Sequence, residues 1–225
     1  MKGKTIGVIF DCDGTLLDSM GAWREMESEF AHRAGGELTG ADRDLLTTLT
    51  TPEAGRFFHE KFGLGSSADD VVSMVNDYML EYYSTRSVAR RGALPFVQGL
   101  SEFGVRLSVA SSSPVAFLRA GLSHTGFLPL LDAVVSVDDV GKPKREPAVY
   151  ERARDLMETE TTMTWGFEDA VYAIGTLKRA GFHALAVYDC DESGTFEDLS
   201  AAADKTVRGF YELEAGEFVD LAQSV

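Results

Sequence analysis

Two aspartates, Asp11 and Asp13, end the first apolar stretch of the chain. The β-branched, apolar run of residues 5–10 predicts a buried strand, and Gly14 marks a sharp turn after it. Side chains at positions i and i+2 of a strand share one face, with Cα atoms about 7 Å apart. The pair can therefore act on one small group, one carboxylate as nucleophile and the other as proton donor and acceptor. In a purely structural role, the same residues would form a polar turn.

Serines follow the strand predicted at residues 105–110. The hydroxyl of Ser111 and the amides after it can hold a phosphate oxygen. Ser113, directly before Pro114, is expected to cap the next helix, which would leave Ser111 free for a ligand.

A basic cluster, residues 142–145, precedes the helix predicted at 147–157. In a chain this acidic, a lysine beside a carboxylate cluster can offset the charge of the nucleophile and of an anionic substrate. The alternative is a solvated surface lysine. Lys144 and Lys142 are both candidates.

Glu168 and Asp169 follow the strand predicted at residues 163–167. Acidic residues in the first turn of a helix interact favourably with its dipole, so Glu168 and Asp169 could have a purely structural role. If they share a sheet edge with Asp11 and Asp13, four carboxylates gather there. Such a cluster requires a hard cation, and oxygen ligands favour Mg²⁺.

The remaining pattern predicts the fold that positions these residues. Predicted strands alternate with helices, which indicates an α/β fold with a doubly wound parallel sheet whose carboxyl edge binds ligands. Residues 17–92 show helical periodicity and no convincing strand, so they are predicted as a helical insert in a core of residues 1–16 and 93–225. The two connections to such an insert can act as a hinge. The predicted strands are 5–10, 105–110, 133–137, 163–167, 183–188 and, weakly, 206–207.

Within the insert, an amphipathic helix is expected around residues 23–30 and a second after an N-cap at Thr51. Ser66 or Ser67 is expected to cap a longer third helix. The last helix of the chain is predicted at residues 210–221.

The composition of the 225 residues narrows the function classes. A hydrophobic fraction of 44% with 25% charged residues is typical of a globular protein. The net charge of −15 argues against nucleic acid and anionic membranes as partners. Two cysteines and no segment of about 20 apolar residues favour a cytoplasmic protein. The four histidines are scattered, so zinc is not expected, and dinucleotide or ATP loops are not found.

These motifs resemble the haloacid dehalogenase-like (HAD) hydrolase superfamily, in particular its members with a C1-type helical cap (the phosphoglycolate phosphatase and β-phosphoglucomutase group). Residues 11–19 match the first motif closely, and residues 109–111 and 167–169 resemble the second and fourth. Lys144 fits the spacing of the third motif to Pro147 and Tyr150 but lacks the proline that usually follows the lysine. Lys142 has that proline but stands two residues early, so Lys144 is preferred and Lys142 is the alternative.

The resemblance implies a role for each matched residue. Asp11 would be the nucleophile and Asp13 the general acid and base, with its backbone carbonyl on Mg²⁺. Glu168 and Asp169 would complete the metal site with Asp11, and Lys144 would be the catalytic lysine. Ser111, Ser112 and Thr15 would contact the substrate.

The resemblance and the second aspartate favour a Mg²⁺-dependent phosphatase that hydrolyses a small phosphorylated metabolite through an aspartyl-phosphate. A sugar phosphomutase of the β-phosphoglucomutase kind would share every motif, and a non-catalytic phosphometabolite-binding module is a third possibility. Specificity is expected to come from the insert, where four charged residues are candidates for substrate contact or for a solvated helix face: Arg24, Arg56, His59 and Lys61. The sequence carries no signal for an oligomeric state.

Overall fold

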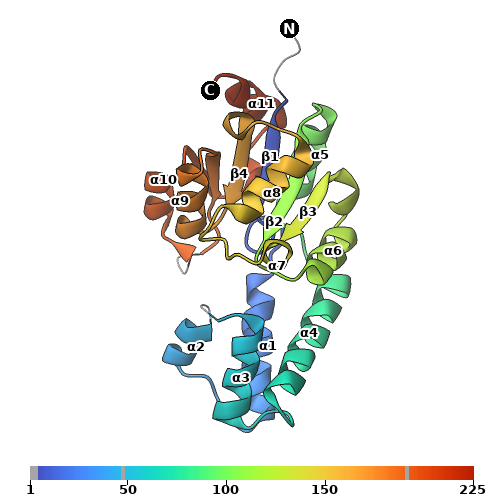
Figure 1. Cartoon of the computed structure of the whole chain (residues 1–225), viewed down its shortest axis with the longest axis vertical. Helices are drawn as coiled ribbons and strands as arrows, with labels where there is room; N and C mark the ends of the chain where they lie inside the picture. The colour runs from blue at the N-terminus through green and yellow to red at the C-terminus, as the bar shows by residue number, and fades with distance from the viewer. Residues whose placement is uncertain (1–4, 47–48, 191–192) are drawn as a thin grey trace. The chain divides into compact units, whose positions relative to one another are not determined.

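A parallel sheet forms the centre of the protein. The computed structural model describes residues 5–46, 49–190 and 193–225 (Figure 1). Within these residues the sheet has six strands in the order β3-β2-β1-β4-β5-β6, all of whose pairings are parallel. The predicted α/β class is confirmed. The strands are β1 (Gly7–Phe10), β2 (Arg106–Ser111), β3 (Ala133–Ser136), β4 (Thr164–Glu168), β5 (His183–Val187) and β6 (Lys205–Val207).

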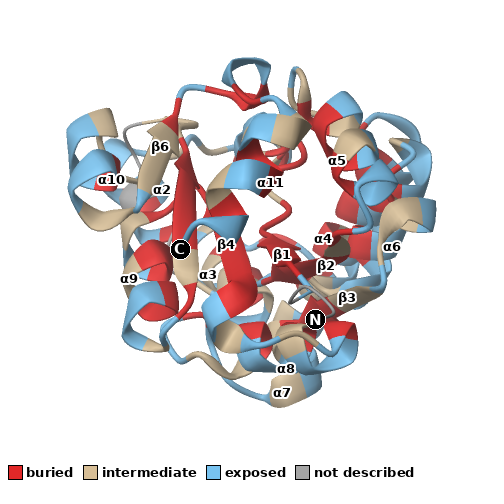
Figure 2. Cartoon of the chain, turned by 90° about the horizontal axis from the view of Figure 1, so that it is seen from above, coloured by how far each residue is buried: buried red, intermediate tan, exposed pale blue. Residues whose placement is uncertain are grey.

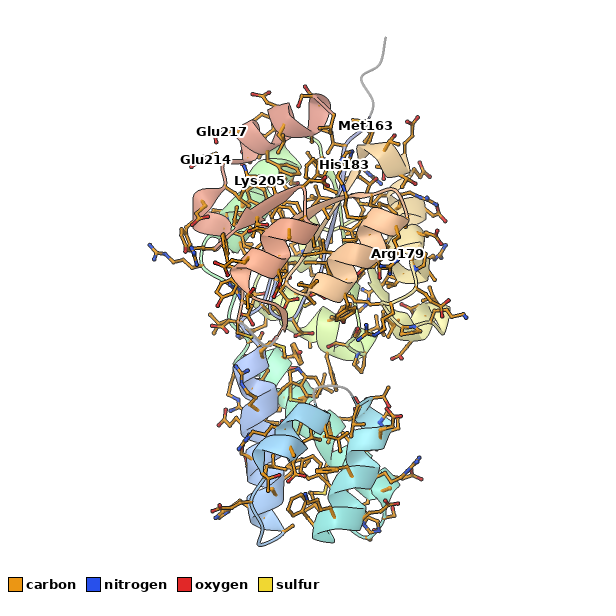
Figure 3. All side chains as sticks on the ribbon, turned by 90° about the vertical axis from the view of Figure 1, so that its left-hand side faces the viewer. Met163, Arg179, His183, Lys205, Glu214 and Glu217 are labelled. Carbon is orange, nitrogen blue, oxygen red and sulfur yellow. The ribbon has the colours of Figure 1, made fainter. Side chains whose placement is uncertain are left out.

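Register brings the functional segments together at one edge. Phe10 pairs with Val109 of β2 and with Phe167 of β4, so the three strands reach the carboxyl edge almost level. The residues that follow, Asp11 and Glu168 among them, therefore emerge side by side. At the opposite edge, His183 and Lys205 begin β5 and β6 (Figure 3).

Helices cover both faces of the sheet because the strand side chains are apolar on both sides. On one face, α8 (Ala148–Met157), α9 (Val171–Arg179) and α10 (Phe196–Ala202) bury aliphatic residues against Ile9, Ala110 and Ala184. On the other face, α5 (Ala93–Glu102) and α11 (Ala215–Gln223) contribute Phe96 and Phe218 to an aromatic cluster with Phe10 and Phe167. Buried residues line the central strands (Figure 2). Among the described residues, two further α-helices accompany the sheet, α6 (Val115–His124) and α7 (Val137–Val140).

The chain divides into two compact units. The α/β unit comprises residues 1–18 and 87–225, and the helical unit comprises residues 19–86. The core was expected to comprise residues 1–16 and 93–225. The α/β unit extends two residues further after the first segment and begins six residues earlier in the second. Residues 1–4 lie outside the described part of the chain. The difference at the second connection arises because residues 87–92 are held by the loop after β1: Asp18 N donates to Val88 O and Arg90 N to Leu16 O.

In its described residues the helical unit contains α1 (Met20–Arg33), α2 (Gly40–Leu46), α3 (Thr51–Phe62) and α4 (Ala68–Thr85). The aromatic rings of Phe30 and Phe58 pack at 5.9 Å in its interior, and α4 adds Val75 and Met79. Ser67 caps α4 by accepting a hydrogen bond from the Asp70 amide. No helix in the described ranges is long and apolar enough to cross a membrane.

The predicted starts of α3 and of the last helix were wrong. The N-cap of α3 is Thr50 rather than Thr51, because the Glu53 carboxylate accepts hydrogen bonds from both the amide and the hydroxyl of Thr50. The last helix begins at Ala215 rather than at residue 210, where a separate 3₁₀ turn, Phe210–Glu212, comes first. Helices α5, α7 and α10 were not predicted.

Candidate active site

Asp11 stands directly after β1 and is almost completely buried. Its amide donates to Phe167 O at 2.9 Å, which extends the pairing of β1 with β4 by one residue and fixes the aspartate backbone. Asp13 is more exposed than Asp11. Cys12 between them is fully buried, and burial raises the pKa of its thiol well above the usual value. The thiol therefore stays protonated and is a poor nucleophile.

The chain turns sharply after Asp13. Gly14 N donates to Leu17 O, and Leu17 N donates to Cys12 O. Gly14 has a φ of 87°, a left-handed conformation that glycine adopts at little cost. Arg90 holds this turn: its guanidinium donates to Gly14 O at 2.8 Å and to Tyr188 O at 2.7 Å, and it pairs with Asp189.

Lys144 lies between two buried carboxylates. Its Nζ donates to Asp11 Oδ1 and, at 2.8 Å, to Glu168 Oε1, although the lysine comes from the loop before α8. The hydroxyl of Tyr150 in α8 donates to the same Glu168 oxygen at 2.7 Å. Lys142, in contrast, is exposed and pairs with Glu146 at 3.3 Å. Of the two candidate lysines, only Lys144 contacts the aspartate.

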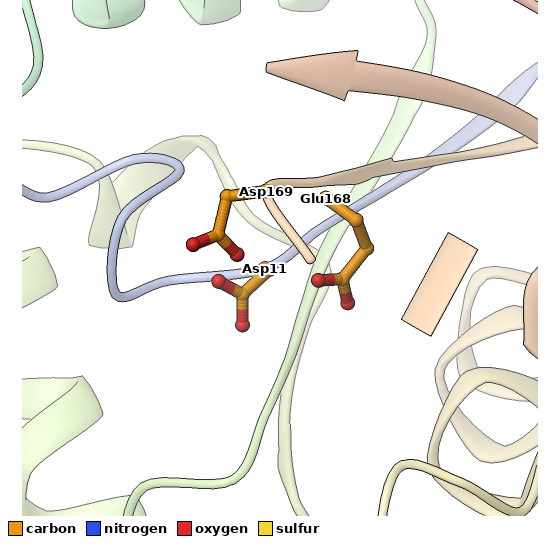
Figure 4. A group of neighbouring side chains, drawn as sticks. All are labelled: Asp11, Glu168 and Asp169. Atoms are coloured by element: carbon orange, nitrogen blue, oxygen red, sulfur yellow. The ribbon is translucent and has the colours of Figure 1, made fainter. Parts of the chain in front are cut away.

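Three carboxylates converge at this point. Ligand atoms of Asp11, Glu168 and Asp169 lie within 4.8 Å of one another, and all three residues are buried (Figure 4). These oxygen donors, gathered from the ends of two adjacent strands, suit Mg²⁺ and offer none of the nitrogen or sulfur ligands that zinc prefers. The cluster thus fits the predicted cation, with Glu168 already sharing one oxygen with Lys144 and Tyr150.

The electrostatics of the cluster also favour an added cation. Burial raises the pKa of Asp11 well above its usual value, opposed by Lys144, and burial together with Glu168 raises the pKa of Asp169 to about 7. Burial disfavours the charged form of Lys144, but Asp11 and Glu168 outweigh it and hold its pKa above the usual value. Lys144 therefore remains positive, and one positive charge does not balance the carboxylates around it.

The serine loop after β2 differs from the expectation. Ser113 does not cap α6, because Pro114 has an extended ψ of 141° and takes the N-cap position itself, so Ser113 stands one residue too early. Ser111 is not free either, since its Oγ accepts a hydrogen bond from Ser113 N at 3.1 Å. Its hydroxyl hydrogen is still a donor for an anion. Ser112 is exposed.

Thr15, two residues after Asp13, is fully buried. Its Oγ1 makes no hydrogen bond to any described residue. A substrate contact by this hydroxyl stays a prediction, and an unpartnered buried hydroxyl is a donor that a phosphate oxygen can satisfy.

The comparisons with known proteins agree with this geometry. A family model described as haloacid dehalogenase-like hydrolase matches residues 7–181. The chain belongs to this family. The hydrolase is 29% identical over 181 residues to validoxylamine A 7'-phosphate phosphatase of Streptomyces hygroscopicus subsp. limoneus, covering 80% of this chain and 84% of that one. It is 26% identical to fructose-1-phosphate phosphatase YqaB of Escherichia coli, covering 83% and 98% of the two chains.

A solved structure shares the fold of the hydrolase. CbbY of Rhodobacter sphaeroides, determined in complex with phosphate, superimposes with a TM-score of 0.78 at 21% identity, covering 93% of this chain and 96% of that one. Family and relatives together identify the protein as a HAD-family phosphatase, a phosphoric monoester hydrolase.

Sequence reasoning missed three features of the hydrolase site. The Tyr150 hydroxyl on Glu168 and the Arg90 contact with Gly14 join residues far apart in the chain, and no local pattern indicates either. The contact of Ser113 with Asp13 was hidden by the capping prediction.

The charged candidates of the helical unit are partly accounted for by contacts within that unit. A ring nitrogen of His59 lies 2.8 Å from Leu64 O, and Lys61 pairs with Asp42. Arg24 and Arg56 are exposed. Their contact with substrate stays a prediction.

Gly14→Ala is expected to weaken the site through a steric effect. A Cβ at this position would lie 2.6 Å from Asp169 Oδ2, and the positive φ adds strain of about 1–2 kcal/mol. We expect Mg²⁺ affinity, measured by isothermal titration calorimetry, to fall about 10–100-fold. Gly104→Ala is the matched control, because Gly104 has a φ of 74° but open space around it. Equal Mg²⁺ affinity in the two variants would contradict the steric argument.

Proposed function

We propose that this phosphatase hydrolyses the phosphate monoester of a small sugar or polyol, with Asp11 as nucleophile and Mg²⁺ as cofactor. The observation that carries the proposal is the buried cluster at the carboxyl edge of the sheet, in which Lys144 contacts Asp11 and Glu168 while Asp169 lies beside them. A reactive anion needs a buried setting with a cation beside it to approach a second anion, and Lys144 supplies that positive charge at Asp11.

The reaction proceeds in two displacements at phosphorus. Asp11 attacks the phosphorus atom, the bond to the ester oxygen breaks, and the departing oxygen takes the electron pair and a proton from Asp13. The alcohol leaves, and phosphate remains bonded to Asp11. Water then attacks phosphorus and gives a proton to Asp13, the bond to Asp11 breaks, and free phosphate and the aspartate are regenerated.

Lys144 supports both displacements by holding Asp11 and by countering the charge of the transferring phosphoryl group. Asp11, Glu168, Asp169 and the backbone carbonyl of Asp13 would hold the Mg²⁺ ion. When bound, the ion neutralises charge on the phosphoryl oxygens. Ser111, with the predicted contacts of Ser112 and Thr15, donates hydrogen bonds to those oxygens.

The substrate class rests on the relatives. Those compared above are named for validoxylamine A 7'-phosphate and fructose 1-phosphate. A small polyhydroxylated alcohol is therefore the proposed leaving group, and the net charge of −15 makes a polyanionic partner unfavourable.

The test is a screen of sugar and polyol monophosphates, with p-nitrophenyl phosphate included, in which inorganic phosphate is measured in the presence of Mg²⁺. Release of phosphate from monoesters without any added bisphosphate supports the phosphatase. Turnover that depends on a sugar bisphosphate and releases little phosphate would instead show a phosphomutase. Absence of turnover on every ester, including p-nitrophenyl phosphate, would favour a binding module.

Metal removal gives a prediction of its own. Activity is expected to be lost in EDTA and restored by Mg²⁺. Mg²⁺ at about 100 times its Kd should also stabilise the protein by about 2–3 kcal/mol in thermal unfolding, because the ion binds the folded state alone. In Asp169→Asn this stabilisation should largely disappear. Asp220→Asn, an exposed position in α11, should keep it. A Mg²⁺-dependent rise in Tm that survives in Asp169→Asn would count against the assigned metal site.

A further inference from the structure

Ser113 and Asp13 are joined by a short hydrogen bond between two strand ends. The Ser113 hydroxyl donates to Asp13 Oδ2 at 2.6 Å. Ser113 is 9% exposed, and it comes from the loop after β2, 100 residues from the aspartate. The hydroxyl has no capping role that would explain it, because α6 is capped by Pro114.

The serine is itself held in place from both sides. Its amide donates to Ser111 Oγ at 3.1 Å, and its carbonyl accepts a hydrogen bond from Ser136 Oγ at 2.9 Å. Ser136 is fully buried at the end of β3, where its amide donates to Asp139 Oδ2 at 2.8 Å. Hydrogen bonds therefore run from the end of β3 through the β2 loop to Asp13, and the donor hydroxyl has a fixed backbone.

A fixed donor matters most to a side chain that must transfer a proton. Asp13 is more exposed than Asp11, and proton transfer works only when the acid lies within hydrogen-bond reach of the departing oxygen. Because the Ser113 hydroxyl donates to Oδ2, it restricts the rotation of the Asp13 carboxyl group.

We propose that Ser113 is a positioning residue for acid catalysis: it orients the Asp13 carboxyl group, which gives a proton to the ester oxygen as the phosphorus–oxygen bond breaks. The electron pair of that bond goes to the ester oxygen, which leaves as the neutral alcohol. This inference rests on the proposed phosphatase reaction and adds a residue to it.

Two esters that differ in their need for acid test the proposal. Departing p-nitrophenolate is stable without a proton, whereas phenolate from phenyl phosphate benefits from one. In Ser113→Ala, we expect kcat/KM to fall about tenfold or more for phenyl phosphate and less than about threefold for p-nitrophenyl phosphate. The loss is smaller than the roughly 10²–10⁴-fold that acid catalysis contributes, because Asp13 itself remains. Both esters are measured on the same sample, so a partly unfolded fraction lowers both values equally and leaves their ratio unchanged.

Two further variants complete the experiment. Ser113→Thr keeps a hydroxyl and should restore the wild-type ratio, while Ser200→Ala removes an exposed hydroxyl in α10 and should leave both values unchanged. An equal loss on both esters in Ser113→Ala, or no loss on either, would overturn the inference while leaving the phosphatase intact. Failure of the wild-type protein to hydrolyse either ester would instead reject the proposed function.

Discussion

Asp11→Asn is expected to lower kcat/KM on the order of 10⁴-fold or more, because the amide nitrogen and oxygen cannot replace a carboxylate as the nucleophile. The substitution keeps the size of the side chain, and the backbone hydrogen bond of residue 11 to Phe167 does not depend on it. The fold should therefore persist while turnover is lost. Phosphate release from p-nitrophenyl phosphate measures the effect.

A trapping experiment separates the nucleophile from other roles of Asp11. Wild-type protein quenched with acid during turnover should carry a phosphate that hydroxylamine removes, and Asp11→Asn should carry none. Asp220→Asn, exposed in α11, is the matched control and should keep full activity. Near-normal turnover in Asp11→Asn, or a phosphate retained by that variant, would end the assignment.

Lys144→Ala is the second change with a large expected effect, and it acts on both stability and rate. The lysine is 4% exposed and contacts Asp11 and Glu168, so its removal leaves two buried carboxylates without their cation. Breaking a buried ion pair in this way costs about 3–5 kcal/mol in the free energy of unfolding. The rate should fall about 10²–10³-fold, as when one charge-stabilising donor is lost.

Lys142→Ala is the matched control, two residues away in the same loop. Lys142 is exposed and pairs with Glu146, four residues later in the chain. An exposed ion pair of this kind contributes less than about 0.5 kcal/mol to stability. Urea unfolding in EDTA compares the stabilities, and steady-state kinetics with Mg²⁺ compares the rates. Should Lys142→Ala be the more damaging variant, the assignment of the catalytic lysine would be reversed.

Local patterns predicted the elements that local forces determine. The apolar run before Asp11 is a strand because its side chains are buried on both faces, and the stripe of Val71, Val75 and Met79 is a helix face because those residues recur at helical spacing. Parallel strands align their carboxyl ends, so residues that follow strands of one sheet were expected at one edge, and Asp11 and Glu168 do meet there.

Capping was harder to predict, since neighbouring serines and threonines compete for one position. Thr50 rather than Thr51 begins α3 because Glu53 stands three residues after it. Pro114 displaced Ser113 from the start of α6, and the displaced hydroxyl bonds to Asp13 instead. A choice between adjacent residues depends on the backbone angle of one residue, which spacing alone does not specify.

The sequence by itself determined the class of chemistry: two aspartates after a buried strand, a lysine and an acidic pair in a fixed order. Only the tertiary structure decided between Lys142 and Lys144, since both lie in one loop and the difference is which Nζ reaches Asp11. The tertiary structure also determined three hydrogen bonds: from Tyr150 to Glu168, from Arg90 to Gly14, and from Ser113 to Asp13. These contacts join segments that the sheet brings together, and a hydrogen bond between distant segments leaves no periodic trace in the sequence.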